Sequence, residues 1–189
     1  MSGRVSRLLD GWEKLRKHIK MGAPEQAIRF LGIHQQIHRS PCQTRQANFC
    51  EYFGDESLEQ CCEKYLELAP AGTVLKEVDM PCMDERKFTN EELSTTGTLA
   101  AVSAQIVMKL LYYARAFRWD CLRTIGVLAG NMTTWSVACD KQLYKLMCWV
   151  KFSVQWHMWS KCGDPISEWR LALFADSDLA GCRATGKLT

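Results

Sequence analysis

The strongest constraint on the fold is a long stretch in which apolar residues recur at helical spacing. Between residues 99 and 155 this spacing predicts three helices, over about 99–117, 120–130 and 137–155. Lys109 and Arg115 interrupt the first, which therefore lacks the roughly 20 uncharged apolar residues that a membrane span needs. The residues expected on the inner face of the third helix are Leu143, Leu146, Met147, Val150 and Val154.

The pattern before residue 70 changes from helix to strand and back. VSRLLDGWEKLRKHIKM has one apolar stripe and predicts an amphipathic helix with basic residues on its other side. QAIRFLGIHQQIHR and QANFCEYF are extended runs that predict a hairpin turned near SPCQT, with a kink or bulge at Gly32. ESLEQCCEKYLELA predicts a second helix, with Asp55 as its N-cap. Its expected inner face consists of Leu58, Cys61, Cys62, Tyr65 and Leu66.

The remaining segments complete the predicted architecture. Residues 70–97 are polar, contain Pro81 and fit a connecting segment. WHMWSK and WRLALFAD predict two strands joined by a loop around CGD. We therefore predict an α+β fold with an N-terminal helix and β-hairpin, a helical middle and a C-terminal two-strand stub.

The net charge of +3 conceals an uneven distribution of charged residues. Residues 1–50 hold nine Lys and Arg against three Asp and Glu, residues 51–100 hold four against twelve, and residues 101–155 hold seven against two. Basic blocks of this kind follow a nucleic-acid backbone in some proteins. In other proteins such basic blocks are solvated helix faces, and the charge distribution alone favours that interpretation here.

The cysteines and the N-terminus indicate a reducing environment. None of the ten cysteines belongs to a C-x-x-C pair, and the first residues have neither the apolar core nor the cleavage site of a signal peptide. We expect an intracellular protein, of cytoplasm or nucleus, with free and mostly buried thiols.

LALFADSDLAG presents two carboxylates at the end of an apolar run. Alternation along a strand points Asp176 and Asp178 to the same side. Carboxylates fixed at a strand end suit Mg²⁺, which prefers hard oxygen ligands. Aspartate also commonly ends a strand at a turn, and the spacing by itself favours that simpler interpretation.

Two further groups of side chains have alternative interpretations. His34, His38 and Cys42 recur every four residues, but on a strand such residues lie about 13 Å apart, too far to share one metal ion. The tryptophans near the C-terminus either stack on nucleic-acid bases or, as we favour, pack a helix against a small sheet. They are Trp149, Trp156, Trp159 and Trp169.

Several stretches, taken in order, resemble the Pol polyprotein of copia-type LTR retrotransposons. They are EKLRKHIKMGAPEQAIRFLGIH, EQCCEKYLELA, MKLLYYARAFRWDCLR, WSVACDKQLYKLMCWV and LALFADSDLAG. The resemblance covers about residues 12–181, and its most specific parts are RFLG, the R-W-D of residues 118–120 and FADSDLAG. In these polyproteins integrase, reverse transcriptase and ribonuclease H follow one another.

The resemblance implies three regions. Residues 1–54 would be the end of the reverse transcriptase palm with a primer-grip-like hairpin, residues 55–155 a helical thumb and tether, and residues 156–189 a truncated start of ribonuclease H. A primer–template or RNA–DNA hybrid would be the partner. The expected nucleic-acid-binding residues are Lys14, Arg16, Lys17, Arg29, Phe30, Leu31 and Gly32.

The resemblance also implies a remnant of a catalytic centre. Asp176 would match the first metal-binding, catalytic carboxylate of ribonuclease H, and Asp178 the acidic residue two positions later. Mg²⁺ would be the cofactor of the intact enzyme, whose two-metal site needs further carboxylates. We expect this chain alone to bind no Mg²⁺.

The chain departs from the family pattern in ways that bear on activity. It contains no Y-x-D-D, and CRATGKLT follows the aspartates in place of the rest of the nuclease. We expect a polyprotein fragment that lacks polymerase and nuclease activity and retains weak nucleic-acid binding. The alternatives are a helical protein-interaction module at residues 55–155, or a decayed remnant without a selected function.

Overall fold

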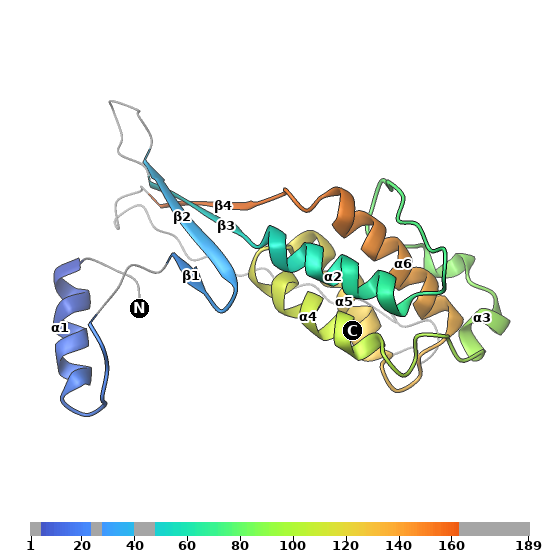
Figure 1. Cartoon of the computed structure of the whole chain (residues 1–189), viewed down its shortest axis with the longest axis horizontal. Helices are drawn as coiled ribbons and strands as arrows, with labels where there is room; N and C mark the ends of the chain where they lie inside the picture. Colours follow the sequence, from blue (N-terminus) through green and yellow to red (C-terminus); the bar gives the residue numbers. More distant parts are fainter. Residues whose placement is uncertain (1–4, 24–27, 40–47, 163–189) are drawn as a thin grey trace.

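The computed structural model describes residues 5–23, 28–39 and 48–162, and it combines one antiparallel sheet with a group of packed helices (Figure 1). The predicted α+β class is therefore confirmed. The strands are β1 (Arg29–Phe30), β2 (Ile33–Arg39), β3 (Asn48–Phe53) and β4 (Met158–Cys162). The helices are α1 (Val5–Arg16), α2 (Asp55–Leu68), the 3₁₀ helix η1 (Glu85–Lys87), α3 (Asn90–Ser94), α4 (Ser103–Ala116), α5 (Trp119–Gly130) and α6 (Val137–Phe152).

The sheet has the order β1-β2-β3-β4, and every neighbouring pair is antiparallel. Strands β2 and β3 form the predicted hairpin. The expected kink or bulge at Gly32 is wrong, because the chain instead makes a two-residue turn at Leu31 and Gly32 and β1 pairs back onto β2. Gly32 has φ +82°, so it takes the left-handed conformation that such turns require.

Strand β4 joins the same sheet as the N-terminal hairpin. The chain leaves the sheet after β3, passes through α2 to α6 and returns as β4, which lies beside β3 (Figure 1). The sequence pattern predicts a separate C-terminal stub for this strand, whereas the strand pairs with β3 of the hairpin. Its expected partner in that stub, WRLALFAD, lies outside the described residues.

The hydrophobic core lies among helices α2, α4, α5 and α6. We call these four helices, together with η1 and α3, the helical body. The expected inner face of α6 is confirmed for its four helical members, whereas Val154 follows the helix and is half-buried. Similar stripes on α4 and α5 complete the core, in agreement with their helical spacing. The largest fully buried side chains include Leu58, Ile106, Leu110, Ile125, Leu128, Leu143, Leu146 and Met147.

Three helix boundaries or faces differ from the expectations. Asp55 is the first residue of α2, and Gly54 takes the N-cap position. Leu66 is 42% exposed and does not belong to the inner face of α2. Helix α4 begins at Ser103 instead of near Leu99, because residues 98–102 form turns, and the Asp140 carboxylate accepts from the backbone N–H of Leu99 at 3.3 Å.

The connecting segment 70–97 contains more structure than expected. Besides η1 it forms α3, which begins with a capping box. The Thr89 hydroxyl accepts from the Glu92 backbone N–H at 3.2 Å, and the Glu92 carboxylate accepts from the Thr89 N–H at 2.8 Å. Glu92 also forms an ion pair with Lys141 on α6, so the short helix is tied to the core helices.

The surface and the cysteines agree with the expectations in part. Seven cysteines are free, Cys50, Cys61, Cys62, Cys82, Cys121, Cys139 and Cys148, and all of these except Cys50 and Cys82 are buried. Within the described ranges no helix has the length and apolar character that a membrane crossing demands.

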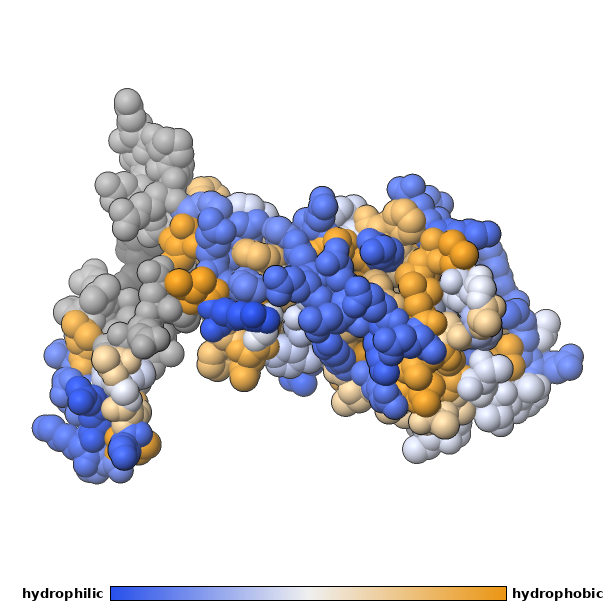
Figure 2. All heavy atoms as spheres, in the orientation of Figure 1, coloured by the Kyte–Doolittle hydropathy of each residue, from blue (hydrophilic) through white to orange (hydrophobic). Residues whose placement is uncertain are grey.

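On α1, by contrast, Leu9 remains 48% exposed, and Figure 2 shows hydrophobic atoms along one side of this helix.

Candidate functional site

The turn between β1 and β2 is the most unusual part of the sheet. Leu31 has φ 51° and Gly32 has φ 82°, which is the pattern of a two-residue hairpin turn that favours Asn-Gly. A leucine in this conformation is strained, because its Cβ approaches the following carbonyl oxygen. The turn is held by the Tyr112 hydroxyl of α4, which donates to the Leu31 carbonyl oxygen at 3.0 Å.

The side chains around this turn are apolar and exposed. Ile28 is 66% exposed, Phe30 60% and Leu31 67%, although each is large and hydrophobic. Arg29 is exposed beside them. Backbone strain of this kind clusters at active sites and binding sites, so this exposed apolar turn is a candidate contact surface. An adjacent hollow of about 270 Å³ is lined by Ile28, His34, Gln35, Gln36, Ile37 and Phe53.

Leu31→Asn is expected to raise the free energy of unfolding by about 1 kcal/mol, because asparagine tolerates positive φ. Urea denaturation monitored by circular dichroism measures the change. Leu66→Asn is the matched control, since Leu66 is exposed within helix α2 and asparagine is a weaker helix former than leucine. An equal loss of stability in both variants would contradict the assignment of strain to the turn.

The basic residues expected to bind nucleic acid lie at the end of α1. Lys14 and Arg16 occupy the last turn of this helix, Lys17 follows it, and all three are exposed. Arg16 is 3.4 Å from Glu13 in a solvent-exposed pair that adds little stability. The structure thus brings Arg29, Phe30, Leu31 and Gly32 together in one turn and places the three cations of α1 on a separate element.

One side of the sheet carries a row of histidines and aromatic rings, which we call the histidine face. Cross-strand pairing puts its members on the same side: His34, His38, Glu51, Phe53, His157 and Trp159. The Phe53 ring is stacked between His34 and His157, at centroid distances of 5.1 and 4.8 Å. Trp156 and Trp159 are 57% and 53% exposed, so neither belongs to the core, although the Trp156 ring contacts that of Trp149 on α6 at a centroid distance of 5.1 Å.

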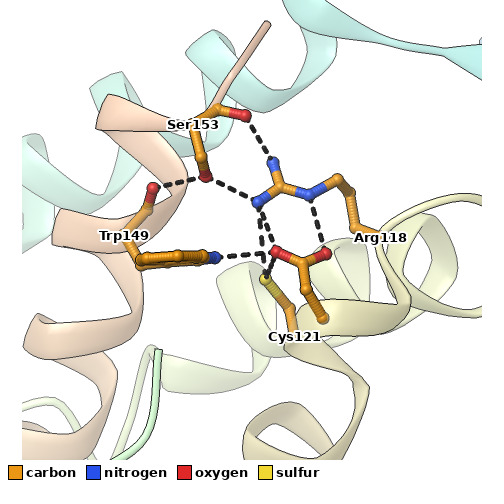
Figure 3. A network of polar contacts seen from close by, with 5 residues as sticks. Arg118, Cys121, Trp149 and Ser153 are labelled. Atoms are coloured by element: carbon orange, nitrogen blue, oxygen red, sulfur yellow. Dashed lines mark hydrogen bonds and ion pairs between the residues drawn. The ribbon is translucent and has the colours of Figure 1, made fainter. Parts of the chain in front are cut away.

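Arg118 and Asp120 of the R-W-D motif belong to a partly buried polar network at the corner between α4 and α5 (Figure 3), whereas Trp119 is 63% exposed and lies outside it. Arg118 is 3% exposed and donates to both carboxylate oxygens of Asp120, at 3.0 and 2.7 Å. It also donates to the carbonyl oxygen of Ser153 at 3.1 Å and to its hydroxyl at 2.6 Å. Trp149 on α6 donates its indole N–H to Asp120 at 2.7 Å. The network therefore ties the α4–α5 corner to the end of α6.

The electrostatics of this network favour the charged forms of both partners. Burial alone would raise the pKa of Asp120, but the hydrogen bonds from Arg118 and Trp149 outweigh it and the pKa is lowered. Burial would lower the pKa of Arg118, yet the adjacent carboxylate raises it. Burial raises the pKa of Cys121 to about 12, so this thiol is not a nucleophile at neutral pH. Because its donors are occupied by protein acceptors, Arg118 is a structural residue.

Sequence reasoning identified the R-W-D motif by resemblance alone and assigned it no role. The contacts of His157 were not predicted either. The other side chains that contact the R-W-D motif and His157 come from distant parts of the sequence, so no local pattern could reveal them. Only the arginine and the aspartate of the R-W-D motif, two residues apart, were a usable signal.

The metal-binding expectations concern residues that the structure does not describe. Asp176 and Asp178 lie outside the described residues, as does Cys42. Over residues 5–23, 28–39 and 48–162, no group of three or more His, Cys, Asp or Glu side chains is arranged to hold a metal ion.

Comparison with known proteins finds no matching family model, no similar curated protein and no similar solved structure.

Proposed function

We propose that this chain is part of a copia-type retrotransposon polyprotein, spanning the end of reverse transcriptase and the start of ribonuclease H, and that it binds nucleic acid. The observation that carries the proposal is the strained and exposed turn at residues 29–32, which matches the RFLG element of the resemblance. A turn that keeps an apolar residue in an unfavourable conformation suits contact with a partner. The basic end of α1 supplies cations for the phosphate backbone.

The proposed partner is a primer–template or an RNA–DNA hybrid bound without sequence preference. Arginine and lysine neutralise phosphates, whereas apolar and aromatic side chains contact sugars and bases. In this proposal Asp176 and Asp178 correspond to the first acidic residues of the ribonuclease H site of such polyproteins, which takes Mg²⁺. The chain alone is then expected to cleave no RNA–DNA hybrid.

Charge reversal of Lys14, Arg16 and Lys17 to glutamate is expected to weaken binding of a fluorescent RNA–DNA hybrid on the order of tenfold or more at about 50 mM salt, through the loss of phosphate contacts. Fluorescence anisotropy measures the dissociation constant. The control reverses Lys64, Lys76 and Lys87, which are exposed on the helical body and change the net charge equally. Equal losses in the two triple variants would contradict a role for α1 and indicate only a net-charge effect.

Leu31→Asn provides a second test that is independent of folding. The variant is expected to be more stable than the wild type, so weaker hybrid binding is not explained by unfolding. If the side chain contacts nucleic acid, its loss reduces affinity on the order of fivefold, which corresponds to about 1 kcal/mol. Unchanged affinity in this variant would remove the turn from the proposed interface.

A further inference from the structure

His157 lies where the sheet meets the helical body. Strand β3 continues into α2 through Gly54, and the chain returns from α6 to β4 through residues 153–157. Both covalent connections between the sheet and the helical body therefore pass beside His157. Figure 1 shows β3 and β4 extending together away from the helices at this junction.

The imidazole of His157 lies between two carboxylates from different elements. Its Nδ1 is 2.6 Å from Glu51 Oε1 on β3, and its Nε2 is 3.1 Å from Asp55 Oδ1 at the start of α2. Carboxylate oxygens only accept hydrogen bonds, so both ring nitrogens donate only when the imidazole carries two protons. A neutral ring has one N–H and leaves its other nitrogen lone pair facing a carboxylate oxygen.

The surrounding groups favour the protonated form. Glu51 also contacts His38 Nε2 through its second oxygen, at 2.6 Å, so this carboxylate is shared by two histidines. The Phe53 ring stacks on His157 and limits access of water. The side chains of His157, Glu51 and Asp55 are 22%, 12% and 35% exposed, so the contacts are weakened by solvent less than surface pairs are.

We propose that His157 is a proton-operated latch between the sheet and the helical body. With two ring protons it bridges Glu51 on β3 and Asp55 on α2, and with one ring proton it releases one of them. On the opposite side of the sheet, Ile33, Tyr52 and Met158 pack against the core. Loss of the proton therefore loosens one side of the junction and leaves the other packed.

The sign of the pH dependence follows from the two groups. Burial would lower the pKa of His157, but the carboxylates of Glu51 and Asp55 raise it above 6.5. The contribution of His157 to stability is therefore present below pH 6.5 and is lost as the pH rises through this raised pKa. Burial would raise the pKa of Glu51, but His157 and His38 lower it below 4.5, so its contribution is present above pH 4.5 and is lost as the pH falls through the lowered value. The latch is therefore closed at pH values between the lowered pKa of Glu51 and the raised pKa of His157.

The first measurement is an NMR titration of the full-length wild-type protein. The His157 ring signals are expected to titrate with a pKa above 6.5, and the backbone amide signals of Gly54 and Asp55 are expected to follow the same curve. Glu51→Gln removes one carboxylate and is expected to lower the pKa of His157. A wild-type value at or below 6.5, or junction amides that do not follow His157, would overturn the proposal.

The second measurement is the urea midpoint of unfolding as a function of pH. In the wild type the midpoint is expected to fall as the pH rises from 6.5 to about 9. In His157→Gln, whose side chain does not titrate, the midpoint is expected to be lower and level over this interval. His18→Gln, at an exposed histidine outside the network, is expected to retain the wild-type fall. A fall of the wild-type size in His157→Gln would assign the pH dependence to other groups and overturn the latch.

Discussion

Arg118→Met is expected to lower the free energy of unfolding by about 3–5 kcal/mol, because it leaves the partly buried carboxylate of Asp120 without its cation. The guanidinium also satisfies the carbonyl oxygen and the hydroxyl of Ser153, and both lose a donor in the variant. Since the network joins the α4–α5 corner to the end of α6, the loss affects the packing of three core helices. Urea denaturation at neutral pH measures the change.

Two further variants define the cause of this loss. Arg123→Met removes an exposed arginine from α5, the helix that follows Arg118, and is expected to change stability by less than about 0.5 kcal/mol. Arg118→Lys keeps the charge but lacks the planar group that reaches Asp120 and Ser153 together, so most of the loss should remain. A loss below about 1 kcal/mol in Arg118→Met would show that the network is not a principal support of the core.

Gly97→Ala is expected to lower the free energy of unfolding by about 2–3 kcal/mol, near the upper end of the usual cost of overpacking. A Cβ at this buried position would lie 2.6 Å from the Ser136 carbonyl oxygen and 2.8 Å from Asp140 Oδ2. The first is a backbone atom, and the second accepts hydrogen bonds from the backbone and the hydroxyl of Thr98, at 2.6 and 2.9 Å. Neither atom can move without disturbing the contacts that anchor residues 97–99 to α6.

The control for this substitution is Gly126→Ala. Gly126 is exposed within α5, and a Cβ there would meet nothing within 4 Å. Alanine is the better helix former, so the variant is expected to gain about 0.5–1 kcal/mol. Thermal unfolding of the two variants compares them directly, and a neutral result for Gly97→Ala would mean that the loop around it relaxes easily.

The helical core could be predicted from the sequence because its signal is local. The apolar spacing of Leu143, Leu146, Met147 and Val150 identified both α6 and its inner face. The β2–β3 hairpin was likewise visible as two adjacent extended runs. The short helix α3 was missed although its capping box, Thr89 with Glu92 three residues later, was readable in the sequence.

The features that could not be predicted depend on distant partners or on local strain. The loop before α4 is anchored by Asp140, which lies 41 residues beyond Leu99. The role of Arg118 requires Ser153, 35 residues further along the chain, and that of His157 requires Glu51, 106 residues before it. The turn at Leu31 contradicts the residue preference for positive φ, so a reading based on preferences favours a bulge at the following glycine.

The salt dependence of hybrid binding tests the central claim most directly. For contacts to the phosphate backbone, the logarithm of the association constant falls linearly with the logarithm of the salt concentration, by about 0.7–0.9 per phosphate contacted. We predict this behaviour for the wild type, and a slope that becomes shallower by about two to three in the variant with Lys14, Arg16 and Lys17 reversed. Absence of hybrid binding by the wild type at about 50 mM salt, or a slope that the triple variant leaves unchanged, would contradict the account.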